Sequence, residues 1–139
     1  MSPSADARHH STPSEVLGFT RGQIVQELGY DDDVDLDLRD AMEDMIEADL
    51  EDEDFQEIAD AVVIWWREGD GDLTDALVDA IGTLDPGGPI WLLTPKPGRD
   101  GHVLPGEVQE AADTAGLRVM GTQNLAADWT GTRLASRQN

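Results

Sequence analysis

The chain has 139 residues, 39% of them hydrophobic, which is enough for one domain with a buried core. Thirty acidic residues against nine basic ones give a formal net charge of −21, and this surplus of carboxylates excludes direct binding to nucleic acid or to anionic membranes. The absence of cysteine excludes disulfides, thiolate metal sites and cysteine nucleophiles.

The first 16 residues are expected to form a disordered tail. They are rich in Ser, Pro and Ala and lack the apolar segment of a secretory signal. No apolar run in the chain reaches the roughly 18 residues that cross a bilayer. With the lack of cysteine, these features predict a cytoplasmic protein in which residues 17–139 form a single domain.

The first regular elements are a strand and a helix. Residues 22–28 contain the β-branched pair Ile24 and Val25 and predict a strand that ends at Gly29. From Leu38 to Leu50, apolar residues recur at steps of three and four, which predicts a helix with one apolar and one acidic face. The aspartates before this helix favour its N-terminus.

The middle of the chain contains the strongest strand signal. Residues 50–60 lead into it as either a loop or a short helix, with Phe55, Ile58 and Ala59 turned inward. Residues 59–66, ADAVVIWW, are apolar on both faces, as a central parallel strand requires, so Trp65 and Trp66 should point to opposite faces. An apolar stripe over residues 73–84 predicts the next helix, and PIWLLT the next buried strand.

The last third begins with a loop rich in Pro and Gly, residues 95–103. Residues 104–116 predict a helix with Gly116 as its C-cap. Residues 117–125 and 131–136 predict two strands in an antiparallel hairpin. The alternation of strands and helices predicts an α/β fold: a Rossmann-like three-layer sandwich with a mainly parallel sheet of about five strands and a C-terminal antiparallel hairpin.

Four stretches carry a resemblance to a known family: VQELGYDDDVD, ADAVVIWWREGDGDLTDALVDAI, IWLLTPKPGRDGHV and DWTGTRLA. Through them, nearly the whole chain from Leu17 onward resembles a family of small acidic actinobacterial proteins called domain of unknown function 3052. This resemblance implies no catalytic residues. Residues 61–136 are also similar to the C-terminal half of a Rossmann-fold methyltransferase, through a helix ending in LDPGG, the strand PIWLL and the hairpin.

A cofactor of such folds binds at the carboxyl ends of the strands, where glycines after the first strand let backbone N–H groups reach it. Here LGYDDDVD follows the first strand, and its three adjacent aspartates exclude a dinucleotide pyrophosphate. S-adenosylmethionine is a cation at sulfur and is not excluded by charge, but residues 29–58 contain no strands to hold its ribose and adenine. We therefore expect no bound cofactor.

A metal site is not expected either. Asp70, Asp72 and Asp75 form either a weak Mg²⁺ or Ca²⁺ site or, as we favour, a helix start with Asp72 as the N-cap. The three histidines have no spacing that would bring them to one metal ion.

The carboxyl ends of the parallel strands should bring several side chains to one edge of the sheet. These candidates for a ligand site are Tyr30, Trp66, Asp70, Asp72, Thr94, Lys96 and His102. Lys96, the only lysine of the chain, either acts on a substrate as an orienting group or general acid, or forms an ion pair that holds its loop; the ion pair is favoured.

All of the charge imbalance lies in residues 27–85, where 23 acidic residues face only Arg39 and Arg67. A solvated acidic surface without a partner would give this composition, and so would an electrostatic binding face. The candidates for partner binding are Asp31, Asp32, Asp33, Asp35, Asp37 and Trp129, the last expected to be partly exposed near the hairpin turn.

We therefore expect a non-enzymatic interaction or regulatory domain on a degenerate Rossmann-like scaffold, which binds a basic protein partner. The alternative is a small methyltransferase-like enzyme or ligand-binding protein that uses the carboxyl edge of the sheet. No residue pattern decides the oligomeric state.

Overall fold

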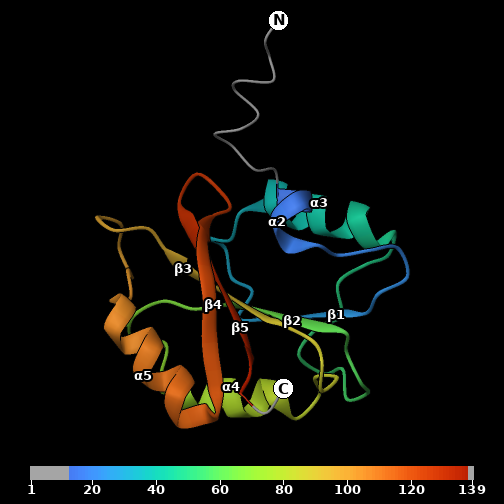
Figure 1. Cartoon of the computed structure of the whole chain (residues 1–139). Coiled ribbons are helices and arrows are strands. Elements are labelled where there is room, and N and C mark those ends of the chain that lie inside the picture. Colours follow the sequence, from blue (N-terminus) through green and yellow to red (C-terminus); the bar gives the residue numbers. More distant parts are fainter. Residues whose placement is uncertain (1–12, 138–139) are drawn as a thin grey trace, which may run out of the picture.

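The computed structural model describes residues 13–137. Figure 1 shows their helices and strands, which in chain order are α2 (Pro13–Leu17), β1 (Val25–Leu28), α3 (Leu36–Ile46), β2 (Ala61–Trp65), α4 (Leu73–Ile81), β3 (Ile90–Pro95), α5 (Pro105–Ala115), β4 (Leu117–Asn124) and β5 (Trp129–Ser136). Most of the expected tail, residues 1–12, lies outside the described residues. The described chain begins with the helix α2, which starts at Pro13.

The five strands form one mixed sheet in the order β1-β2-β3-β5-β4. β1, β2 and β3 are parallel, whereas β5 runs antiparallel to both β3 and β4. The predicted α/β fold, the five strands and the C-terminal hairpin are confirmed. The sheet is less parallel than expected. Two pairs of neighbouring strands are parallel, β1 with β2 and β2 with β3, and two pairs are antiparallel, β3 with β5 and β5 with β4.

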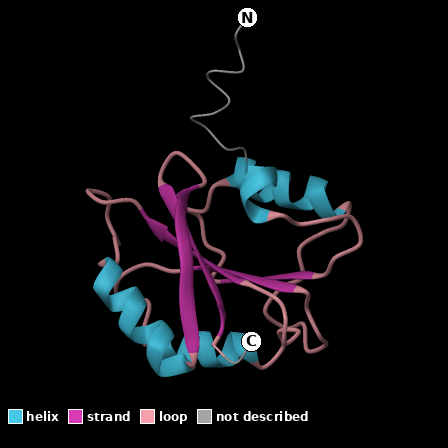
Figure 2. Ribbon diagram, in the orientation of Figure 1, coloured by secondary structure: helices cyan, strands magenta, loops and turns pink. Residues whose placement is uncertain are grey.

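Helices lie on both sides of this sheet, α2 and α3 on one side and α4 and α5 on the other (Figure 2). Alternate residues of β2 supply both cores: Val63 and Trp65 pack with α3, and Val62 and Ile64 pack with α4 and α5. All five residues of β2 are buried, as predicted for the central strand. Along residues 13–137, no helix combines the length and the apolar character that crossing a bilayer requires.

The helix after β1 is shorter than predicted. Asp35 is its N-cap, with a side chain that accepts from the backbone N–H of Leu38 at 2.8 Å. The helix ends at Ile46 rather than at Leu50, because Glu47 adopts a left-handed conformation with φ of 57° and cannot continue it.

Residues 51–58 form a loop, the first of the two alternatives. Phe55 packs against the core that contains α4 and α5, as expected. Ile58 was predicted to point inward but is 59% exposed. The neighbouring Ala59 is fully buried, and adjacent residues of an extended segment point in opposite directions.

Gly29 ends β1 where the chain passes closest to β2. Its φ is +77°, and a Cβ atom there would lie 2.2 Å from the backbone oxygen of Trp65. Glycine is therefore required both for the left-handed turn and for the close approach of the two strand ends.

Replacing Gly29 by Ala should lower the free energy of unfolding by about 2–4 kcal/mol, because left-handed strain adds to displacement of the Trp65 carbonyl. Gly98→Ala is the matched control, since Gly98 has a φ of +86° and open space around the added Cβ. It should cost only about 1 kcal/mol. Urea denaturation followed by tryptophan fluorescence measures both variants, and equal losses would show that the approach to Trp65 does not matter.

Candidate functional site

A pocket of about 620 Å³ opens at the carboxyl ends of β1 and β2, next to α4. Tyr30, Phe55 and Trp66 contribute aromatic rings to its lining. Its charged lining residues are four acids and one base: Asp31, Glu53, Asp70, Asp79 and Arg67. A pocket at this edge of an α/β sheet is where a ligand of such a fold is expected.

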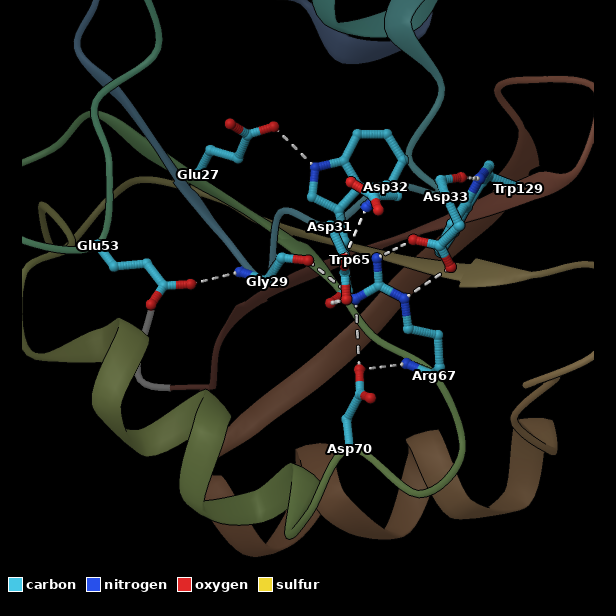
Figure 3. A network of polar contacts seen from close by, with 10 residues as sticks. All are labelled: Glu27, Gly29, Asp31, Asp32, Asp33, Glu53, Trp65, Arg67, Asp70 and Trp129. Carbon is cyan, nitrogen blue, oxygen red and sulfur yellow. Dashed lines mark hydrogen bonds and ion pairs between the residues drawn. The ribbon is translucent and has the colours of Figure 1, made fainter.

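The guanidinium of Arg67 lies across the ends of both strands (Figure 3). Its Nη1 donates to the backbone oxygens of Gly29 at 2.8 Å and Trp65 at 3.1 Å. Its Nε donates to one carboxylate oxygen of Asp33 at 3.0 Å, and its Nη2 to the other. Asp70 lies 3.3 Å from Nη1. One side chain therefore joins β1, β2 and the loops that follow each of them.

The ionisation of this cluster is shifted towards the charged forms. The hydrogen bond from Arg67 lowers the pKa of Asp33 below its ordinary value, against the opposing effect of partial burial. Burial by itself lowers the pKa of Arg67, but the hydrogen bonds and charges of Asp33 and Asp70 outweigh it and raise that pKa above its ordinary value. The positive charge of Arg67 is therefore neutralised within the chain.

The backbone donor after β1 is also occupied by the chain itself. The N–H of Gly29 donates to Oε2 of Glu53 at 2.9 Å. In a Rossmann-like cofactor site, this N–H is one that would face an anionic ligand group. The Glu53 carboxylate takes that position here, and it comes from the loop beside the outer edge of β1.

A second ion pair joins β1 to α3. Glu27 is buried and accepts from Arg39 Nε at 2.6 Å and Nη2 at 2.9 Å, and from Trp65 Nε1 at 2.9 Å. The hydrogen bond to Glu27 raises the pKa of Arg39 above its ordinary value. The Arg39 guanidinium also lies 4.8 Å from the centre of the Tyr30 ring. Both arginines of residues 27–85 are thus paired within the chain.

Sequence analysis missed the roles of Glu27, Arg39, Glu53 and Arg67. One signal was present: Arg39 and Arg67 are the only bases among the 23 acids of residues 27–85. An isolated base in such a segment is a strong candidate for an internal ion pair.

The predicted ligand-site residues fall into separate groups. Tyr30, Trp66 and Asp70 line the pocket with Arg67. Asp72 caps α4 by accepting from the backbone N–H of Asp75 at 3.1 Å, which confirms the favoured interpretation. Within the described part of the chain, no three acidic or histidine side chains are grouped so that they could hold a metal ion.

The remaining predicted ligand-site residues lie elsewhere. Thr94 and His102 line a second pocket, beside α5. Lys96 is half-buried and forms no ion pair with any residue in 13–137, so the favoured ion-pair interpretation was wrong. Its loop is held instead by an ion pair of Arg99 with Asp128, at 2.8 Å.

The aspartates predicted to bind a partner have different roles in the structure. Asp31, Asp32 and Asp37 are exposed, Asp33 is paired with Arg67, and Asp35 is the N-cap of α3. These aspartates form one acidic surface after β1.

Trp129 was predicted to be partly exposed but is only 3% exposed. It begins β5 rather than lying in the turn, and its ring packs edge-on against Trp65 with ring centres 4.9 Å apart. Its Nε1 donates to the backbone oxygen of Asp33 at 3.2 Å. Trp129 is therefore a buried residue that fixes the backbone beside the Arg67–Asp33 ion pair, and it offers no exposed surface to a partner.

The sequence matches a protein family and curated mycobacterial proteins. The model of a family described as "Protein of unknown function (DUF3052)" matches residues 14–138. The uncharacterised proteins Mb2263c of Mycobacterium bovis and Rv2239c of Mycobacterium tuberculosis are each 50% identical over 128 residues, which cover 92% of this chain and 80% of the relative.

The fold is similar to that of methyltransferases. The pyocyanin biosynthetic protein PhzM gives a TM-score of 0.67 at 13% identity, over 88% of this chain and 52% of PhzM. Mitomycin 7-O-methyltransferase MmcR gives 0.60 at 12%, over 89% and 52%. The CcbJ methyltransferase of Streptomyces caelestis gives 0.60 at 12%, over 89% and 87%. The chain spans about half the length of PhzM and MmcR, and identity this low shows a shared fold alone.

The pairing of Asp33 with Arg67 should make stability depend on pH. Asp33→Asn should lower the free energy of unfolding at neutral pH by about 0.5–1 kcal/mol, a small value because the Asp33 side chain is 54% exposed and solvent screens the pair. The pKa of Asp33 is lowered in the folded state, so its contribution is present above the unfolded pKa of about 4 and is lost as the pH falls through the folded value.

Wild type and Asp33→Asn should therefore differ most near neutral pH and converge in acid. Urea denaturation between roughly pH 7 and pH 2.5 measures this difference. A difference that stays constant over the whole range would mean that the charge of Asp33 contributes nothing.

Proposed function

This chain belongs to the DUF3052 family of proteins of unknown function, and from that premise we propose that it is a non-enzymatic domain that binds a basic protein partner in the cytoplasm. The binding face would be the acidic surface formed by residues 31–54. The scaffold would be a three-layer Rossmann-like domain in which the chain's own side chains occupy the backbone groups that would bind a cofactor.

The distribution of unpaired charge carries this proposal. Arg39 and Arg67, the two bases of residues 27–85, both form ion pairs within the chain. Of the exposed acids of residues 31–54, Asp33 is paired with Arg67 and Glu47 with Arg21. The other exposed acids are Asp31, Asp32, Asp37, Asp40, Asp44, Asp49, Glu51, Asp52, Glu53 and Asp54. Such a surface attracts basic groups over distances of about one Debye length and accelerates their association.

Two exposed apolar side chains lie at the start of this surface. Tyr30 is 52% exposed and Leu36 is 58% exposed. Tyr30 is held in place by the stacked Arg39 guanidinium, which reduces the entropy that the ring would lose on binding. Tyrosine is enriched among residues that dominate interface energetics, so Tyr30 replaces Trp129 as the candidate aromatic anchor.

A pair of matched variants tests the acidic face. Asp31→Asn with Asp32→Asn removes two charges and keeps an oxygen to accept the Asp32 backbone N–H, which Asp31 Oδ1 now accepts at 2.7 Å. A basic protein captured from lysate of the native cell at low salt should bind this variant about 3- to 10-fold more weakly. Binding to the wild type should weaken steeply as salt rises.

The control variant removes the same number of charges from a different part of the surface, on α5. Glu107→Gln with Glu110→Gln removes two exposed charges from α5 and should leave the affinity for the captured protein nearly unchanged. Equal weakening by both double variants, or an affinity that does not respond to salt, would contradict a specific acidic face.

The second candidate function is a methyltransferase-like ligand site, favoured by the pocket of about 620 Å³ at the carboxyl ends of β1 and β2. Against it, Glu53 occupies the Gly29 N–H and Arg67 lies across both strand ends. β1 is the edge strand, and among residues 13–137 only a single bridge between Gln26 and Glu51 extends the sheet beyond it.

Thermal unfolding with S-adenosylmethionine separates the two candidates. We expect no rise in Tm, because the required backbone donor is already bound. A ligand at about 100 times its Kd stabilises the folded state by ~2.7 kcal/mol, which is easily detected in a domain of this size. A clear rise in Tm would establish ligand binding and favour the methyltransferase-like candidate.

A further inference from the structure

A second pocket, of about 370 Å³, lies at the other end of the carboxyl edge, between α5, the loop after β3 and the hairpin. Its lining contains no Asp, Glu, Lys or Arg, although the chain has 39 such residues. The lining residues are Thr94, Pro97, His102, Val103, Pro105, Val108, Gln109, Val119, Thr122, Asn124, Thr130 and Thr132. This is an uncharged site in a strongly acidic protein.

The floor of this pocket is made by two rows of side chains across three strands. Thr94 of β3 pairs with Thr130 of β5, which pairs with Asn124 of β4. In the next row, Thr132 of β5 pairs with Thr122 of β4. Residues directly opposite each other in a ladder lie on the same face, so these hydroxyls and one amide form a continuous polar patch.

Several of these polar groups lack strong partners. Thr94 and Thr132 are each only 6% exposed. Across residues 13–137, the Thr94 hydroxyl forms no hydrogen bond, and the Thr132 hydroxyl has only the 3.4 Å contact with Thr122. Among the described residues, Trp91 Nε1 is the only buried side-chain polar atom without a partner. The Thr94 hydroxyl is therefore accessible from the pocket and can exchange a water molecule for a ligand group.

The wall of the pocket offers a further acceptor. His102 Nδ1 lies 2.8 Å from the backbone oxygen of Pro95, and because that oxygen accepts, Nδ1 carries the hydrogen. In the neutral ring, Nε2 is then an acceptor without its own hydrogen. The side chain of Gln109 adds an amide from α5. Hydroxyls, amides and an imidazole acceptor together match a ligand that carries many hydrogen-bond donors and acceptors.

We propose that this pocket binds a small uncharged polyhydroxy molecule of about monosaccharide size. The volume lies near the lower end of the range for small-molecule sites, about 300–1,000 Å³. The lining has no cation to pair with an anionic ligand, and the net charge of −21 disfavours one further. A cation would bind better at the other pocket, with its four carboxylates. This site is independent of the proposed partner-binding face.

The probes are D-glucose and myo-inositol, with D-glucuronate as the charged counterpart, titrated into the ¹⁵N-labelled full chain. Both neutral compounds should shift the amide resonances of residues around Thr94, His102 and Thr132, and glucuronate should shift them far less. Thr94→Val and Thr132→Val remove a hydroxyl while keeping the shape of the side chain, and each should weaken binding about five- to tenfold.

Thr20→Val is the control, because Thr20 is exposed and lies outside both pockets. It should bind the neutral compounds as the wild type does. The amide spectrum shows directly that each variant is folded. The proposal is overturned if neither neutral compound shifts these resonances, if glucuronate binds equally well, or if folded Thr94→Val and Thr132→Val bind like the wild type.

Discussion

The guanidinium of Arg67 is the interaction on which the carboxyl edge of this domain depends. It binds the carbonyl oxygens of Gly29, directly after β1, and of Trp65, at the end of β2, together with the carboxylates of Asp33 and Asp70. Backbone oxygens at strand ends lack further sheet partners and are normally satisfied by water or by a ligand. Here one arginine satisfies them, and its planar set of donors fits this task better than a lysine would.

This arrangement also explains how a chain with such an excess of acid remains compact near β1. Self-repulsion between carboxylates destabilises a folded state. The two bases within residues 27–85 are placed where they hold together segments far apart in the sequence: Arg39 to Glu27 over 12 residues, and Arg67 to Asp33 over 34. The acids without such partners lie at the surface, where water screens them and where a basic protein would meet them.

Much of the fold was predictable from local patterns. Apolar periodicity gave the helices and the central strand, and Asp72 and Gly116 were correctly identified as caps because capping depends on one or two neighbouring residues. The errors concern contacts between distant segments. Trp129 directly follows the hairpin turn, where an exposed side chain is expected, yet its burial is decided by Trp65 on β2. In the same way, the backbone N–H and oxygen of Gly29 are bound by Glu53 and Arg67, which lie 24 and 38 residues away in the sequence.

The central claim is that Arg67 binds the carboxyl ends of β1 and β2 together in solution, and NMR of arginine side chains tests it most directly. The side chain of Arg67 is 14% exposed and its Nε–H is bound to Asp33, whereas Arg118 is exposed and serves as an internal reference. We predict a resolved Arg67 Nε–H resonance that exchanges slowly with water at neutral pH and does not move when S-adenosylmethionine is added. An Arg67 resonance that exchanges as fast as that of Arg118, or that shifts on addition of the adenosyl compound, would contradict the account.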